Sequence, residues 1–299
     1  YFGQPPGIIY SALVQSPVVS PYNPDGTINQ LNNQSYLGGG TTTASNPLAI
    51  QKFITEEINN NRLYGSLYGT FDITNKINFK SLVGYDLDDY QSSFYRGTQF
   101  LYRNDTSPQP FAQSSGANGF NWLWENTINY QETFKNVHKL GVLVGYTAQK
   151  QKNEVNLVTA NGFVDDQVPN VAGGIIRGGG VNESEWALAS ALMRLNYGYK
   201  SKYLAAVTVR SDRASRFGSD NQTGIFPSVS VGWRLTEESF MESLDKVNEL
   251  KLRASYGVAG NFEIGNYSAI SLLGSVNYPE NGILFPGSSL STLGDSELT

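Results

Sequence analysis

Hydrophobic and polar residues alternate along much of the chain. From residue 61 onward, Leu63, Leu67 and Phe71 occupy odd positions, and mainly polar or tyrosine side chains occupy the even positions between them. A period of two places successive side chains on opposite faces of a β-strand. The alternating segments are 62–74, 77–91, 122–134, 140–149, 186–199, 203–212, 225–233 and 250–257. They predict an all-β chain of about eight antiparallel strands, each long enough to cross a bilayer at a tilt.

The connections between these segments alternate between short and long. Short turns are expected at Asn75, Asn136 and Ser201, and long Gly-containing loops near Ser107, Gly173 and Ser219. A soluble β-sandwich spaces its turns more evenly, whereas an outer-membrane barrel has short periplasmic turns and long extracellular loops. The asymmetry therefore favours a segment of a transmembrane β-barrel, with the short turns in the periplasm.

The regions outside the strands are predicted from their turn-forming residues. Residues 1–60 are rich in Pro, Gly, Asn, Ser and Thr and are expected to form an extracellular loop region, with one or two helical turns at 50–58. Residues 61–257 hold the strands, and residues 258–299 are expected to form a second extracellular loop region. A short helix is predicted at Thr236–Leu244, where Thr236 would cap the helix and the glutamates that follow would favour its dipole.

Composition narrows the function. The chain has 299 residues, of which 12% are aromatic, and the aromatic residues gather near predicted strand ends, a position that suits lipid headgroup depth. The net charge of −5 and the lack of a basic stripe argue against nucleic acid as a partner. The absence of Cys excludes a disulfide scaffold. No apolar run approaches the roughly 20 residues of a membrane helix.

Short motifs in a fixed order carry a family resemblance. They are Arg210, Asp212, Ser215-Arg216-Phe217, Phe226-Pro227-Ser228, Gly232-Trp233, Leu250–Arg253, Ser255–Gly257 and Gly260-Asn261. In this order they resemble the barrel core of the SusC/RagA family of TonB-dependent outer-membrane transporters. The segments 124–146 and 46–51 resemble two further blocks of that family.

The resemblance implies a function and partners. The whole protein would import an oligosaccharide or a peptide across the outer membrane of a Gram-negative, Bacteroidetes-like cell, and would not be an enzyme. Its partners would be a SusD-like lipoprotein, the TonB complex and outer-membrane lipid. The resemblance implies no cofactor, metal or catalytic residue, and it assigns no substrate-binding residue.

The resemblance also sets expectations about extent. Barrels of this family resemble the 22-stranded, plugged kind, so about eight strands would form only part of the wall. The signal peptide, the plug and the remaining strands would lie outside this sequence. One departure concerns a turn, because Arg213 and Ala214 stand where the family has Gly and Ser. Gly is favoured where a turn needs a positive φ.

Three charged residues in the motif region are candidates for chemistry. Arg210, Asp212 and Arg216 would either pair with one another at the base of a loop or bind an acidic substrate. The geometry of charge-assisted hydrogen bonds favours the loop-base network.

His138 is the single histidine. With no Cys it does not make a transition-metal site or a Ser-His-Asp set, and we interpret it as a turn residue. Asp86, Asp88 and Asp89 lack the glycine of an EF-hand loop and are interpreted as a polar, lumen-facing strand end.

Other patterns are weaker. Gly38–Gly40 and Gly178–Gly180 lack the Lys-Ser/Thr sequence of a phosphate-binding loop and are interpreted as loop glycines. The loop aromatics would either stack on sugars or peptides or pack the loops together. These aromatics are Phe100, Tyr102, Phe111 and Phe120.

Two other functions remain alternatives at this point. One is a soluble β-sandwich that binds glycans through its loop aromatics. The other is a small structural barrel of the eight-stranded class.

Overall fold

The structure is a computed structural model of the whole chain. It describes residues 7–15, 19–30, 45–101, 107–241, 247–280, 282–295 and 297–298. Gly38–Gly40 and Tyr102 lie outside the described residues.

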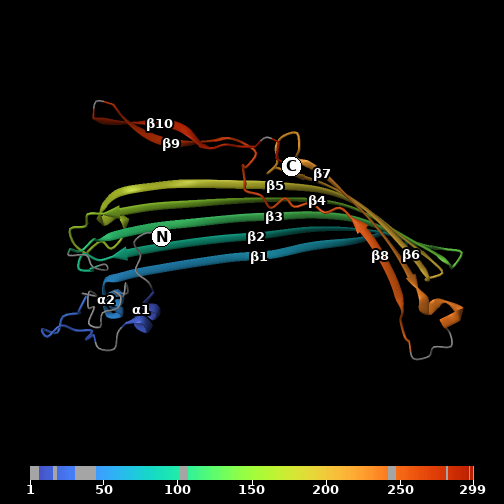
Figure 1. Cartoon of the computed structure of the whole chain (residues 1–299), viewed down its shortest axis with the longest axis horizontal. Coiled ribbons are helices and arrows are strands. Elements are labelled where there is room, and N and C mark those ends of the chain that lie inside the picture. Colours follow the sequence, from blue (N-terminus) through green and yellow to red (C-terminus); the bar gives the residue numbers. More distant parts are fainter. Residues whose placement is uncertain are drawn as a thin grey trace, which may run out of the picture. The chain divides into compact units, whose positions relative to one another are not determined.

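The described elements are two short helices, ten strands and three 3-10 turns (Figure 1). The helices are α1 (Ile8–Val14) and α2 (Pro47–Phe53). The long strands are β1 (Ile54–Thr74), β2 (Ile77–Arg96), β3 (Phe111–Phe134), β4 (His138–Asn161) and β5 (Ile175–Tyr199). The shorter strands are β6 (Tyr203–Ala214), β7 (Thr223–Arg234), β8 (Lys251–Gly257), β9 (Leu272–Glu280) and β10 (Ile283–Thr292). The 3-10 turns are η1 (Val171–Gly173), η2 (Leu235–Glu237) and η3 (Ser239–Met241).

Strands β1 to β8 form one sheet in chain order, and β9 and β10 form a separate hairpin (Figure 1). The pairs β5–β6, β6–β7 and β7–β8 are antiparallel, and their register is continuous from one pair to the next. The prediction of an all-β chain with about eight antiparallel strands is confirmed. The β9–β10 hairpin was not predicted.

The tight connections lie where the sequence predicted them. Only residues 75–76 separate β1 from β2, and only residues 200–202 separate β5 from β6. Lys135 and Asn136 both have positive φ, and so do Lys200 and Ser201. Consecutive positive φ values give a turn whose twist matches that of the flanking strands, as in a type I′ hairpin.

The long strands extend beyond their predicted bounds. Strands β1 to β5 have 20–25 residues, about twice the ~9–11 that a tilted strand needs to cross a bilayer. β1 begins at Ile54 rather than at residue 61, and β4 and β5 extend into the region on either side of Gly173 where the sequence predicts a long loop. Backbone pairing continues in these extensions without an alternation of apolar residues, so the pattern ends before the strand does.

The predicted helix at 236–244 is wrong over its described part. The structure has η2 and η3 there, and Thr236 is not a cap, because η2 follows Arg234 and has no side-chain cap. The backbone N–H groups of Leu235 and Thr236 both approach the carbonyl oxygen of Leu250, at 2.8 Å and 3.4 Å. This backbone contact holds the segment against the start of β8.

The chain divides into two compact units. Unit 1 comprises Tyr1–Arg62, Asp88–Gly119 and Asn153–Glu183, and unit 2 comprises Leu63–Leu87, Phe120–Lys152 and Ser184–Thr299. The predicted apolar alternation lies almost entirely in unit 2. Among the described residues, no helix combines the length and apolarity needed to cross a membrane.

Unit 1 has two small buried apolar clusters, one around Tyr95 and Phe163 and the other around Phe100. Phe100 is fully buried with Ala49 and Ile50 of α2. The Asn46 side chain accepts from the N–H of Leu48 and so caps this helix, and it donates to two carbonyl oxygens of the segment 21–29. The family block at 46–51 is therefore a capped helix that holds a neighbouring loop.

Asp166 links its loop to the end of β2 in unit 1 through hydrogen bonds. Its carboxylate accepts from the hydroxyl of Tyr95 at 2.6 Å and from the N–H of Thr98 at 2.7 Å. Burial alone would raise the pKa of Asp166, but these hydrogen bonds hold it below its usual value.

Candidate functional site

Strands β5 to β8 have two chemically different faces. Every second residue of each strand belongs to the apolar face, which we define by the cross-strand rows that the register sets. The rows are Tyr199–Tyr203–Trp233–Leu252, Tyr197–Ala205–Val231–Ala254 and Leu195–Val207–Val229–Tyr256. Val207 and Val231 are 45% and 55% exposed, so no layer formed by the described residues covers this face. The interior of a β-sandwich would bury it.

The alternate residues form the polar face. Its rows are Gly198–Leu204–Gly232–Arg253, Asn196–Ala206–Ser230–Ser255 and Arg194–Thr208–Ser228–Gly257. One side of the sheet is therefore apolar and uncovered, and the other side carries hydroxyls, amides and cations.

At the end of these strands nearest Ser201, which we call the turn end, aromatic rings stack along the apolar face. The rings of Tyr199 and Tyr203 lie 6.4 Å apart, and those of Tyr203 and Trp233 lie 6.5 Å apart. Glu238 accepts from the Tyr203 hydroxyl at 2.8 Å and from the Trp233 indole N–H at 3.0 Å. Hydrogen bonds from Trp233, Tyr203 and Lys202 hold the pKa of the Glu238 carboxyl below its usual value.

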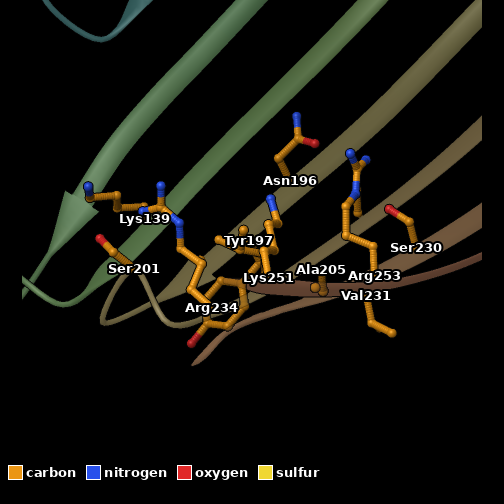
Figure 2. A pocket seen from close by; sticks show the side chains of 14 residues that line it. Lys139, Asn196, Tyr197, Ser201, Ala205, Ser230, Val231, Arg234, Lys251 and Arg253 are labelled. Atoms are coloured by element: carbon orange, nitrogen blue, oxygen red, sulfur yellow. The ribbon is translucent and has the colours of Figure 1, made fainter. Parts of the chain in front are cut away.

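The polar face has a cavity at the turn end, which we call the cationic cavity. It has a volume of about 390 Å³ and includes Lys139, Arg234, Lys251 and Arg253 in its lining. Figure 2 shows Lys251 and Arg253 projecting to one side of the strands, while Val231 projects to the other. Lys251 and Arg253 belong to the motif Leu250–Arg253, but no sequence pattern predicted a cluster with Lys139 and Arg234, because each looks like an ordinary surface charge on its own.

A second cavity lies at the opposite end, the loop end, and we call it the aromatic pocket. Its volume is about 330 Å³, and Phe226, Phe262 and Asp212 are among its lining residues. The Phe226 ring lies directly against Gly260, where a Cβ atom would come within 2.4 Å of it. Glycine at this position therefore leaves the room that the ring occupies. Carboxylate and amide groups complete the lining, from Asp220, Asn221, Gln222 and Asn261.

Arg216 stands beside this pocket in a clamp of aromatic rings. Its guanidinium lies 4.8 Å from the Trp186 ring centre and 5.6 Å from that of Phe262. It also donates to the Asn266 side chain at 2.8 Å and to the carbonyl oxygen of Phe262 at 3.2 Å. Trp186, with Leu188 and other apolar side chains, forms the buried cluster of this end.

The predicted triad of charges is only partly brought together. Arg210 donates to Asp212 at 2.6 Å and to Ser190 at 3.2 Å, in agreement with the network interpretation. Arg216 belongs to the separate aromatic clamp. Arg213 lies within β6, opposite Thr223, and has no positive φ, so the residue that stands in place of the family's Gly is accommodated in a strand.

The other singled-out residues are placed as follows. His138 begins β4, and its Nδ1 lies 2.7 Å from the Tyr197 hydroxyl. The described residues hold no group of three or more His, Cys, Asp or Glu side chains positioned for a metal ion. Gly178–Gly180 lie within β5 rather than in a loop. Phe100 packs in the core of unit 1, and the ring centres of Phe111 and Phe94 lie 6.2 Å apart.

Comparison with known proteins identifies the family. No family model matches the sequence. TonB-dependent receptor P26 of Formosa agariphila is 31% identical over 311 residues, and the match covers all of this chain and 30% of that protein. TonB-dependent receptor P39 of the same organism is 32% identical, over 76% of this chain and 22% of that protein. TonB-dependent receptor SusC of Bacteroides thetaiotaomicron is 41% identical over 90 residues, 30% of this chain and 9% of that protein. The chain belongs to the SusC/RagA family of TonB-dependent receptors.

The receptor fold agrees with solved structures. The structure of the RagAB peptide transporter has a TM-score of 0.79 and 24% identity, over 93% of this chain and 30% of that chain. At this identity the likeness shows the fold alone. The chain spans about 30% of the length of the matched TonB-dependent receptor P26.

The receptor motifs now have physical roles. The Ser215 hydroxyl accepts from the N–H of Ala187 at 2.9 Å, Arg216 occupies the aromatic clamp, and Trp233 donates to Glu238. The Asn261 side chain accepts from the N–H of Glu263 at 2.9 Å. These residues join strand ends to the loops that follow them.

Proposed function

We propose that the whole receptor imports a nutrient across the outer membrane, and that this chain supplies part of the barrel wall. The observation that carries the proposal is the two-faced sheet of β5 to β8. A transmembrane barrel strand alternates apolar residues toward lipid with polar residues toward the lumen. The exposed valines of the apolar face meet the first requirement, and the polar face meets the second.

The turn end would face the periplasm and the loop end the outside. The short turns after β1, β3 and β5 lie at the turn end, and the stacked Tyr199, Tyr203 and Trp233 are suited to headgroup depth. The long connections after β2, β4 and β6 would be extracellular.

The cargo would be an oligosaccharide or a peptide. Both present flat apolar surfaces beside hydrogen-bonding groups. The aromatic pocket offers the Phe226 and Phe262 rings together with the carboxylate of Asp212 and amides. A pocket that combines aromatic rings with hydrogen-bonding groups is typical of small-ligand sites. We propose this pocket as a point of contact for cargo entering from the loop end.

The partners follow from the family. A SusD-like lipoprotein would cover the loop end, and the TonB complex would supply the energy through regions of the receptor other than this wall. The relatives of this chain are named as receptors. The function proposed here is therefore transport rather than catalysis.

Fractionation and uptake test the proposal. The full-length receptor should be recovered in the outer-membrane fraction, and a deletion strain should lose growth on one cargo from a panel of glycans and peptides. Restoration of growth by the wild-type gene, but not in a strain lacking TonB, would support active import. A full-length protein that stays soluble after lysis contradicts the proposal.

A further inference from the structure

The cationic cavity gathers four positive side chains with little compensating charge. They come from the start of β4 (Lys139), the end of β7 (Arg234) and β8 (Lys251 and Arg253). Within the described part of the chain, only Arg234 of the four has an ion pair, with Glu249 at 3.6 Å. Because like charges repel, such a group is costly unless an anion is near.

Small residues make the hollow. Gly198, Gly232 and Ala206 line it, and hydroxyl and amide groups from Ser230 and Asn196 add hydrogen-bonding capacity. A Cβ atom at residue 232 would come within 3.2 Å of the Lys251 side chain, so glycine there leaves room for the cation to lie across the strand. Figure 2 shows Asn196, Lys251 and Arg253 on the same side of the strands.

The position and size of the cavity limit the ligand. It lies on the polar face, opposite the face that meets lipid in the proposed wall, so a lipid headgroup is a poor fit. Its volume of about 390 Å³ lies within the range of small-ligand pockets and suits one or two sugar or amino-acid units. Guanidinium groups match the planar geometry of carboxylates.

We propose that the cationic cavity binds the carboxylate groups of an anionic cargo on its way through the lumen. The inference rests on the proposed import function and narrows its substrate class to acidic oligosaccharides or acidic peptides. Arg253 and Lys251 would contact the anion, and Ser230 and Asn196 would bind its neighbouring hydroxyl or amide groups.

The test measures binding to the purified full-length receptor in detergent, by isothermal titration calorimetry. Matched probes are a galacturonic acid hexamer against the same hexamer with its carboxylates methyl-esterified, and a peptide with four glutamates against the same peptide with four glutamines. We expect the acidic member of at least one pair to bind about tenfold more tightly, equivalent to about 1.4 kcal/mol. The pair that shows the preference identifies the source of the anion. Raising the salt concentration should reduce this preference.

Variants locate the effect. The double variant Lys251→Gln with Arg253→Gln should lose the preference for the acidic probe, and Arg253→Lys should retain part of it. Lys200→Gln is the matched control, because Lys200 lies at the same end but outside the cavity, over the Tyr199 ring. A heat-modifiable band on a gel confirms that each variant is folded.

Two results would overturn the inference. One is equal affinity of wild type for acidic and neutral probes of both pairs. The other is a preference that survives the double variant. Neither result bears on import itself, because a receptor without charge preference still imports neutral cargo. Conversely, a receptor that prefers the acidic probe but supports no uptake contradicts only the proposed function.

Discussion

The two ends of β5 to β8 use aromatic residues in opposite ways. At the turn end, Tyr203 and Trp233 lie on the apolar face, stack on each other and hydrogen-bond to Glu238. At the loop end, Phe226 lies on the polar face and lines a pocket together with Phe262. Alternate residues of each strand lie on the apolar or the polar face, and this decides whether a ring faces lipid or lumen.

The difference teaches how one sheet separates anchoring from binding. Tyrosine and tryptophan at the turn end have a polar atom that reaches Glu238, as suits an interface between lipid and water. Phenylalanine at the loop end has no such atom, and polar groups of other residues surround it. Replacing residues of each class on the same strands therefore gives different phenotypes.

The largest effect is expected from a charge on the apolar face between the two ends. Val207→Arg should destabilise the barrel by about 2–4 kcal/mol if this position lies near the bilayer midplane. The matched control is Thr208→Arg, one residue along β6 and on the polar face. Urea unfolding of the full-length receptor in lipid vesicles measures both. Equal destabilisation by the two variants would show that the faces are wrongly assigned.

The next effect concerns the aromatic clamp at the loop end. Arg216→Ala removes the contacts with Trp186 and Phe262 and two hydrogen bonds, and should cost about 2 kcal/mol. The loss should appear as faster proteolysis within residues 258–271. Arg213→Ala is the control, because that arginine contacts only the nearby Gln222 in the described structure. Similar cleavage of both variants would contradict a special role for the clamp.

A smaller effect is expected at the aromatic pocket. Phe226→Ala should weaken cargo binding about tenfold, or about 1.4 kcal/mol, with little change in folding. Phe240→Ala is a suitable control, because Phe240 is exposed in η3 at the turn end. Titration with the cargo identified by growth compares the two. If the Phe226→Ala variant binds cargo with unchanged affinity, the aromatic pocket does not contact the cargo.

The smallest effect is a pH dependence at the turn end. Because hydrogen bonds lower the folded-state pKa of Glu238, its contribution is complete above the unfolded-state value near 4.5 and is lost as pH falls through the lower folded-state value. Trp233 fluorescence, obtained as the difference from a Trp233→Phe variant, should change in that acidic range. Glu238→Gln should abolish the change. A transition that persists in Glu238→Gln would assign it to another group.

The sequence predicted those parts of the fold that depend on local pattern. The alternation in 203–212 and 225–233 predicts two neighbouring strands, and the antiparallel register of β6 against β7 confirms them. Lys200 and Ser201 were placed in a tight turn from the short spacing between two strands. Both inferences need only residues near one another in the chain.

Other parts depend on distant residues or lack a pattern. Arg216 and Asn266 lie 50 residues apart, so no local signal joins them. The polar extensions of β1 to β5 have no apolar alternation, so the sequence pattern does not distinguish them from loops. The cationic cavity combines residues as far apart as Lys139 and Arg253, and only the register of β7 against β8 brings Gly232 opposite Arg253.

The order of the sheet has a consequence for assembly. Each strand from β1 to β8 is hydrogen-bonded to its neighbour in sequence, so no pairing within the wall requires a distant segment to arrive first. Contacts of short sequence separation form quickly, because little loop-closure entropy is lost. The wall can grow as a series of hairpins, each of which offers its free edge as a template for the next.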